Sequence, residues 1–331
     1  MSSNIDERLF KKCTEEKTKS QGKIPFWYPV FLWSKEQGYD FRDPEQLRDK
    51  YRKYCKKNKI DFTQTKMDEK SQMKIMPRPR IAVFDLELLP GISYFWDIWN
   101  QNIYIDQIIQ DKCLLSWAGK FLNEPEMHSD IMTSKEAKER DASRITKSCW
   151  EFLSQADIVI GHNMVGFDAK HANTSFLEYG LDPLKYIIVD TLLVARKNFN
   201  FVSNKLEYIN QKLGIRNKIE NDGFPLWKAC SNGDSKALKT MLDYNIGDIG
   251  STEELFYKLR PYVRNINVAL YNEILTSQCP VCGSTDLKSE GEYYTPAGKW
   301  ESVRCQDCRA ISRKKENLLE KDKKKSLVIN S

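Results

Sequence analysis

The chain has 331 residues, of which 40% are hydrophobic and 30% are charged. This length suffices for roughly two domains with a sizeable core, which excludes a small fold held by disulfides. The composition is globular, and no uncharged apolar run approaches the roughly 18 residues that a membrane-spanning helix needs. The amino terminus is charged where a signal peptide would be apolar, so we expect a cytoplasmic protein without a membrane span.

Charge and cysteine are unevenly distributed along the chain. The net charge of +6 divides into +8 for residues 1–80, −5 for residues 81–278 and +3 for residues 279–331. An acidic centre between basic ends is typical of a cation site flanked by segments that attract a polyanion such as nucleic acid. The alternative is that these are only solvated surfaces. Five of the nine cysteines are scattered singly, which suits free thiols in a reducing compartment.

Residues 1–60 predict a basic helical module. In residues 43–59, Leu47, Tyr51 and Cys55 recur at helical spacing, so one face can pack. The cations Arg48, Arg52, Lys53 and Lys56 then look outward. The apolar stretch PFWYPVFLW leaves two roles open for this module, binding nucleic acid or docking a protein partner. Residues 61–79 are polar, lack a period and end with two nearby prolines, which predicts a linker.

From residue 80 the pattern changes to strands and then to alternating helices and strands. Strands are expected at 80–89, 92–99, 112–122, 157–161 and from 186. Helices are expected at 135–155, from 169, at 203–214 and at 234–259. This order predicts an α/β domain with a mixed sheet over residues 80–270.

The strand AVFDLEL carries two acids, Asp85 and Glu87, two positions apart and therefore on one face. Paired acids in apolar surroundings repel each other unless a cation lies between them, and a divalent metal is the natural cation. Taken alone, the pair would also fit an exposed sheet edge.

Two further acids and a tyrosine are candidate site residues. Asp168 follows a strand and a short loop in ADIVIGHNMVGFD, where it could also be only a helix cap. Tyr244 and Asp248 lie one helical turn apart in YNIGD, on one face. That pair alone would also fit an ordinary helix surface.

Together, FDLE, the N-x-x-x-F-D spacing of HNMVGFD and the Y-x-x-x-D spacing of YNIGD resemble the 3′-5′ exonuclease superfamily with a ribonuclease H-like fold. This is the tyrosine (DEDDy) type, similar to the proofreading domain of family B DNA polymerases. The histidine type would need His in the third motif, and the three histidines lie elsewhere. The wider pattern, with IWNQNIYIDQII and the closing cysteine pairs, looks like stand-alone exonuclease-like proteins of bacteriophages and bacteria. The resemblance covers about residues 80–310 and leaves no room for a polymerase.

The resemblance implies a ribonuclease H-like mixed sheet flanked by helices, with two Mg²⁺ or Mn²⁺ ions held by carboxylates. Asp85, Glu87 and Asp248 would bind the ion that activates water, and Asp85 would also bridge to the second ion. Asp168 would hold that second ion through water. Tyr244 would orient the water, because a phenol with an ordinary pKa of about 10 is a poor base near neutrality. Residues implied to contact the terminal nucleotides are Leu86, Asn163 and Phe167. Phe167 would do so by stacking, although it would also fit as a core residue.

Two C-x-x-C pairs, Cys279 with Cys282 and Cys305 with Cys308, are separated by 22 residues. Four thiolates at this spacing predict one structural Zn²⁺ in a ribbon over residues 277–312, and two pairs disfavour a redox dithiol. The aromatic and basic residues between the pairs either form a stacking surface for a single strand or only pack the ribbon. The charged tail, residues 313–331, is expected to be disordered or a frayed helix.

These observations predict a two-metal 3′-5′ exonuclease that removes nucleoside 5′-monophosphates from the 3′ end of DNA, with single strands favoured. RNA remains open as a substrate, since neither the acids nor Tyr244 can read a 2′-hydroxyl. An RNA-processing exoribonuclease and a catalytically quiet nucleic-acid-binding protein are the alternatives. A replication or repair protein is a possible partner, and a phage-encoded chain would work in the host cytoplasm.

Overall fold

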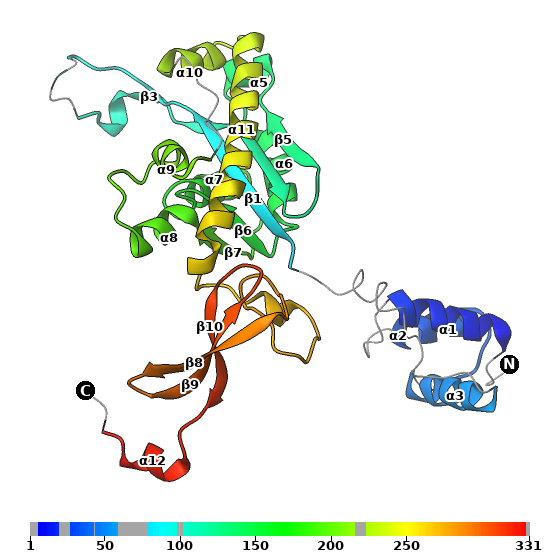
Figure 1. Ribbon diagram of the computed structural model, residues 1–331. Helices are drawn as coiled ribbons and strands as arrows, with labels where there is room; N and C mark the ends of the chain where they lie inside the picture. Colours follow the sequence, from blue (N-terminus) through cyan, green and yellow to red (C-terminus); the bar gives the residue numbers. More distant parts are fainter. Residues whose placement is uncertain are drawn as a thin grey trace. The chain divides into compact units, whose positions relative to one another are not determined.

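The computed structural model describes residues 6–19, 27–42, 44–58, 79–97, 99, 102–215 and 223–328. The chain divides into two compact units, Met1–Met76 and Pro77–Ser331 (Figure 1). The linker expected at residues 61–79 lies, except for its last residue, outside the described residues.

The first unit is helical, as expected for residues 1–60. Its helices are α1 (Glu7–Lys19), α2 (Trp27–Glu36) and α3 (Pro44–Lys57). The apolar face of α3 is buried through Leu47, Tyr51 and Cys55, which join Leu9 and Phe41 in a small core. Lys53, Lys56 and Lys57 are exposed, so α3 has the packed face and the basic face that its periodicity predicts.

The second unit is built on a mixed sheet of five strands, in the order β5-β4-β1-β6-β7. β1 pairs antiparallel with β4, which pairs antiparallel with β5, whereas β6 and β7 run parallel to β1. The expected mixed α/β sheet is confirmed. The strands are β1 (Ile81–Leu89), β4 (Cys113–Phe121), β5 (Met127–Ile131), β6 (Ile158–Gly161) and β7 (Ile187–Asp190).

Helices cover both faces of this sheet (Figure 1). Along β1, Phe84 and Leu86 enter a core formed with α6 and α7, whereas Val83 packs with Ile249 of α11. Asp85 and Glu87 share the face of Val83, which turns them toward α11. The helices are α5 (Ser134–Glu139), α6 (Ser143–Leu153), α7 (Asp168–Glu178), α8 (Thr191–Asn198), α9 (Leu206–Leu213), α10 (Phe224–Ser231) and α11 (Ser235–Leu259).

The long strand expected at residues 92–99 is not formed. Among the described residues of this range, only those of β2 (Ile92–Ser93) form a strand, and β2 pairs with β3 (Ile108–Gln110), which follows the short 3-10 helix η2 (Ile105–Gln107). The described residues 92–97, 99 and 102–110, which we call the arm, project from the sheet (Figure 1). Their aromatic side chains, such as that of Trp96, are exposed. Aromatic composition favours strand, but the arm pairs only with itself and so gains no place in the central sheet.

The second unit ends in a three-stranded antiparallel sheet, in the order β10-β9-β8. Short 3-10 helices η3 (Arg260–Tyr262) and η4 (Val268–Tyr271) lead to it. The ribbon expected to end at residue 312 continues to Asn317, because β10 pairs with β9, so the expected disorder from residue 313 is wrong there. We call residues 279–317 the ribbon. Its strands are β8 (Leu287–Thr295), β9 (Gly298–Cys305) and β10 (Ile311–Asn317), and α12 (Lys321–Ser326) follows.

None of the helices within the described residues combines the length and apolar character that crossing a lipid bilayer requires.

One charged cluster joins α6 to the edge of the sheet. Arg144 donates to Asp130 of β5 at 2.6 Å and to both carboxylate oxygens of Glu136 at 2.7 and 2.9 Å. This bidentate bond to Arg144 is the main reason why the pKa of Glu136 is lowered to about 2 from the ordinary 4.5. A depressed carboxyl pKa stabilises the fold above pH 4.5, and the contribution is lost as the pH falls toward 2.

Arg144→Met is therefore expected to lower the free energy of unfolding by about 1 kcal/mol at pH 7, since the cluster is only partly buried. The deficit should shrink between pH 4.5 and pH 2, when wild type and variant are compared by urea unfolding across that range. Lys147→Met, on the exposed side of the same helix, is the control. A deficit that stays constant with pH would disprove the linkage to Glu136.

Candidate active site

Three carboxylates meet where β1 faces α11. Asp85 and Glu87 come from β1 and Asp248 from α11, and each offers an oxygen within 4.8 Å of the other two. Asp85 and Glu87 are half-buried, and Asp248 is buried. The register places Glu87 opposite Ser116 of β4, next to an irregularity of the strand pairing after Glu87. Three predicted acids, up to 163 positions apart in the chain, are thus brought together.

A buried amide fixes one of these acids. Asn245 donates through its side chain to Oδ2 of Asp85 at 2.6 Å, and its Oδ1 accepts from the Ser116 hydroxyl at 3.1 Å. Asn245 is fully buried. The chain Ser116–Asn245–Asp85 therefore ties β4, α11 and β1 together at the acids.

Sequence reasoning missed Asn245. A signal was present: Met241, Asn245, Asp248 and Ile249 recur at helical spacing along the buried stripe of α11. A polar side chain within such a stripe needs a buried partner.

Asp168 begins α7 and lies beside β1. Its Oδ1 accepts the backbone N–H of Leu86, between the two acids of β1, at 3.1 Å. Burial raises the pKa of Asp168 to about 7, and the bond from Leu86 opposes that rise. Among the described residues Asp168 is not part of the three-acid group, although it touches the backbone that separates Asp85 from Glu87.

Tyr244 lies one helical turn before Asp248, as the Y-x-x-x-D spacing predicts. Its side chain is buried, with its ring set edge-on to Trp227 of α10 at 6.3 Å between centroids. The ring of Tyr244 thus contacts α10 and is part of the core that α11 forms with the sheet.

Another buried acid, Asp190, shapes the loop that leads to Asp168. It accepts the N–H of Asn163 at 3.0 Å and that of Val165 at 2.9 Å, and it caps α8 through Leu192. These bonds hold Asn163 in the left-handed region, with φ of 66°. Sequence reasoning missed Asp190, although an acid at the end of a buried strand and before a helix is a typical cap signal.

The three residues expected to contact a nucleotide differ in how exposed they are. Asn163 is exposed, and Phe167 is half-buried, with its ring edge-on to His171 at 4.6 Å. Phe167 also packs against the core, so both of its expected roles remain open. The expected contact of Leu86 with a nucleotide is corrected. This residue is only 2% exposed, and its backbone N–H donates to Asp168. Because that side chain is in the core, it has no surface for a nucleotide.

The donor set of the acidic group fits a divalent cation. Three carboxylates this close repel one another, and an ion of opposite charge removes the repulsion. All three ligands are carboxylate oxygens, which suits Mg²⁺ or Mn²⁺. The three histidines, at positions 128, 162 and 171, stand outside the group.

A second group of four ligands lies in the ribbon. The Sγ atoms of Cys279, Cys282, Cys305 and Cys308 lie within 4.8 Å of one another, and two of the pairs are 3.5 Å apart. Bonds of about 2.3 Å in a tetrahedron would put sulfurs about 3.8 Å apart, so the group fits Zn²⁺. A hydrogen bond from Cys279 is the main reason why the pKa of Cys282 is lowered to about 5. The cluster is compatible with a zinc ribbon.

A family model and the sheet order agree on the fold of the second unit. Residues 119–260 match the model of the RNase H superfamily, a stretch that includes Asp168, Tyr244 and Asp248. It begins beyond β1, so Asp85 and Glu87 lie outside the match. The fold expected from the sequence, an α/β ribonuclease H-like mixed sheet flanked by helices, is thereby confirmed.

Other comparisons add less. A search of curated proteins finds no match. Among solved structures the chain is similar to the family B DNA polymerase of the hyperthermophilic archaeon Pyrobaculum calidifontis, at 18% identity and a TM-score of 0.41. The similarity covers 56% of this chain and 25% of the polymerase, so the chain spans about a quarter of that protein.

Proposed function

We propose that this protein is a 3′-5′ exonuclease that uses two Mg²⁺ or Mn²⁺ ions to remove nucleoside 5′-monophosphates from DNA, preferring single strands. The observation that carries the proposal is the group formed by Asp85, Glu87 and Asp248, with oxygens within 4.8 Å of one another. The match to the RNase H superfamily supports a nucleic-acid-cleaving function. A scaffold that only bound nucleic acid would have no need to bring three like charges together.

Each side chain has a stated task in this proposal. Asp85, Glu87 and Asp248 would hold one ion, and Asp168, beside the backbone of β1, would hold the second together with Asp85. When bound, the ions supply charge stabilisation for the attacking and leaving oxygens of an in-line displacement. Asn245 keeps Oδ2 of Asp85 in place, so that the carboxylate does not turn away from the site.

Tyr244 is the proposed positioning group for the water. It belongs to the same helix as Asp248, one turn before it, and its ring lies edge-on to Trp227 of α10. Asn163, exposed on the loop before α7, and the half-buried Phe167 are the proposed contacts to the terminal nucleotide.

The proposal also assigns a role to each larger part of the chain. We assign residues 80–270 to the nuclease domain, residues 1–60 to a basic helical module and the four cysteines of the ribbon to one structural Zn²⁺. The exposed lysines of α3 give the module a cationic face, which suits a polyanion.

A direct assay tests the proposal. Single- and double-stranded DNA, RNA and an RNA–DNA hybrid, each labelled at the 5′ end, are incubated with Mg²⁺, with Mn²⁺ or with neither ion. We expect a ladder that shortens from the 3′ end of single-stranded DNA, only when an ion is present, with nucleoside 5′-monophosphates as products.

Three results would contradict this function. Cleavage of circular single-stranded DNA would make the enzyme an endonuclease. Activity confined to RNA would favour the exoribonuclease alternative, while binding of every substrate without hydrolysis under all ion conditions would favour a binding protein.

A further inference from the structure

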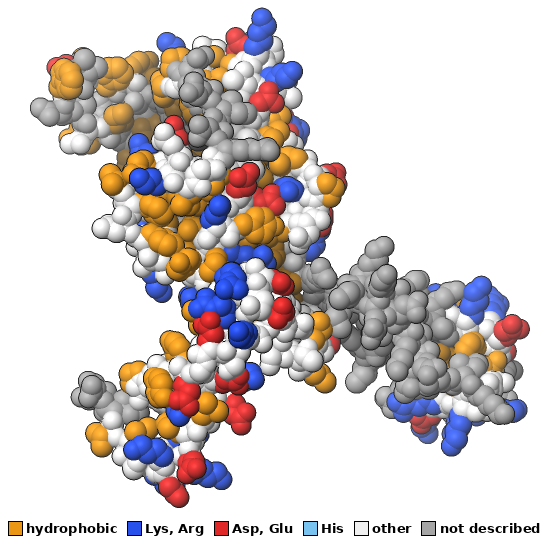
Figure 2. Space-filling view, in the orientation of Figure 1, with side chains coloured by type: hydrophobic (Ala, Val, Ile, Leu, Met, Phe, Trp, Pro, Cys, Tyr) orange, Lys and Arg blue, Asp and Glu red, His pale blue; other side chains and the backbone are white. Residues whose placement is uncertain are grey.

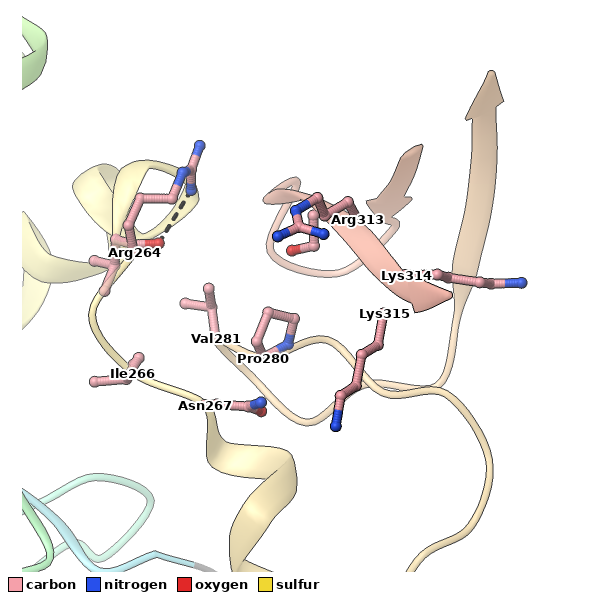
Figure 3. Close-up of a pocket in the computed structure, with 10 residues that line it drawn as sticks. Arg264, Ile266, Asn267, Pro280, Val281, Arg313, Lys314 and Lys315 are labelled. Atoms are coloured by element: carbon pink, nitrogen blue, oxygen red, sulfur yellow. Dashed lines mark hydrogen bonds between the residues drawn. The ribbon is translucent and has the colours of Figure 1, made fainter. Parts of the chain in front are cut away.

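A cavity of about 510 Å³ opens between the nuclease core and the ribbon. It is distinct from both groups of metal-ligating residues, none of which lines it. The core side is the segment after α11, from Val263 to Asn267, and the ribbon side consists of Pro280, Val281 and strand β10 (Figure 3).

The cavity has an apolar floor and a cationic rim. Val263, Ile266 and Val281 are buried and form the floor. Arg264, Arg313, Lys314 and Lys315 supply positive charge, and no acidic residue is among the lining residues. Figure 2 shows Lys and Arg side chains gathered in this region of the surface.

The cations come from two directions and are partly held in place. Arg264 donates through Nη1 to the carbonyls of Pro261 and Val263, at 2.7 and 3.0 Å. Arg313 lies over the ring of Trp300, with its guanidinium carbon 4.1 Å from the ring centroid. In Figure 3 Arg313 reaches from β10 toward the gap between the core and the ribbon, and the Arg264 side chain rises along the core side of that gap. Such restrained guanidinium groups bind phosphates with little loss of side-chain entropy.

Lys314 differs from its neighbours. It points away from Arg264 in Figure 3, and its ammonium group pairs with Glu301 of β9 at 2.8 Å. Its charge is therefore partly neutralised within the ribbon, so Arg264, Arg313 and Lys315 remain as the cations of the cavity.

We infer that this cavity binds the phosphodiester backbone of the nucleic acid several nucleotides away from the 3′ end, an inference that rests on the proposed function. The cations would contact phosphates, and the apolar floor would accept a sugar or base. From Asp248 to the end of α11 the helix alone rises by about 16 Å. Because stacked nucleotides advance about 3.4 Å each, a dinucleotide at the acids cannot reach the cavity, whereas a longer strand can.

The test compares two double variants of the full chain that remove the same charge. Arg264→Gln/Lys315→Gln alters the cavity, whereas Lys288→Gln/Lys321→Gln alters two exposed lysines that do not line it. Binding of a fluorescent dT20 is measured by anisotropy between 50 and 200 mM KCl, without Mg²⁺ or Mn²⁺. Unchanged melting temperature and zinc content exclude misfolding.

For the cavity variant we expect roughly tenfold weaker binding at low salt and a salt slope smaller by about 1.4, which corresponds to two lost contacts on a single strand. The control should stay within twofold of wild type. In hydrolysis, KM for dT20 should rise, while cleavage of a dinucleotide is unchanged. Equal losses in both variants, or no loss in either, would overturn the inference.

The binding assay does not depend on catalysis. If the protein hydrolyses no substrate but the cavity variant alone loses salt-dependent affinity, the proposed exonuclease fails and the cavity stands as a nucleic-acid site. If hydrolysis is normal and both variants bind dT20 like wild type, only the cavity inference falls.

Discussion

Asp85→Asn is expected to reduce the rate of hydrolysis at least a thousandfold, which corresponds to about 4 kcal/mol of lost transition-state stabilisation. Asp85 lies within the three-acid group, and the proposal gives it contact with both ions. Asparagine keeps the shape of the side chain but removes the charge that holds a cation. The measurement is single-turnover cleavage of 5′-labelled single-stranded DNA with saturating Mg²⁺ or Mn²⁺.

The same variant has a second readout that needs no activity. In the metal-free protein the three carboxylates repel one another, so Asp85→Asn should unfold at the same or a higher temperature than wild type. Mn²⁺ at about 100 times its Kd would stabilise the wild type by about 2.7 kcal/mol, and the variant should lose most of this gain.

Asp243→Asn is the matched control, because Asp243 is exposed on the same helix, next to Tyr244. It should keep both hydrolysis and the stabilisation by Mn²⁺. Hydrolysis at the wild-type rate by the Asp85→Asn protein would remove Asp85 from the metal site and, with it, the two-metal mechanism.

Cys305→Ser is expected to release zinc and unfold the ribbon while the nuclease core stays folded. Cys305 is buried and pairs through its Sγ with Cys282 at 3.5 Å. The ribbon has few buried apolar residues of its own, and a structural zinc contributes about 10–16 kcal/mol to folding in comparable small modules. Hydrogen exchange should accelerate in β8, β9 and β10 and remain slow in β1 and α11.

Cys113→Ser, a change to a half-buried cysteine outside the cluster, should retain one zinc per chain. Metal analysis of the wild type, purified without chelator, provides the decisive check: a chain without zinc would refute the assignment. Because Val281 lines the cavity and packs in the core shared with Val263, loss of zinc should also weaken the binding of dT20.

Local patterns determined much of this protein from its sequence. The alternation of β1 places Asp85 and Glu87 on one face, and helical spacing places Tyr244 one turn from Asp248. The two C-x-x-C pairs indicated a four-thiolate group, which the structure assembles. The two acids of β1, the Tyr244–Asp248 pair and each C-x-x-C pair depend on residues two to four positions apart, where backbone geometry alone decides which side chains are neighbours.

Other features depend on partners that are distant in the chain. The bond from Asn245 to Asp85 spans 160 positions, and the burial of Asp190 depends on a loop that folds back onto β7. The pattern of residues 92–99 was that of a strand, yet no strand of the central sheet pairs with it. Residues 313–317 had the composition of a disordered tail, yet Arg313 and Asn317 pair with Ser302 and Trp300 of β9.

The cavity beside the ribbon also depends on residues that are distant in the chain. Arg264 and Lys315 are ordinary surface cations in the sequence, 51 positions apart. Only the packing of the ribbon against the segment after α11 brings them to one rim. The sequence pattern of a helix or strand determines which of its faces is apolar. Which other element covers that face is decided by long-range packing, because the free energy of burying apolar surface is gained only when the two elements meet.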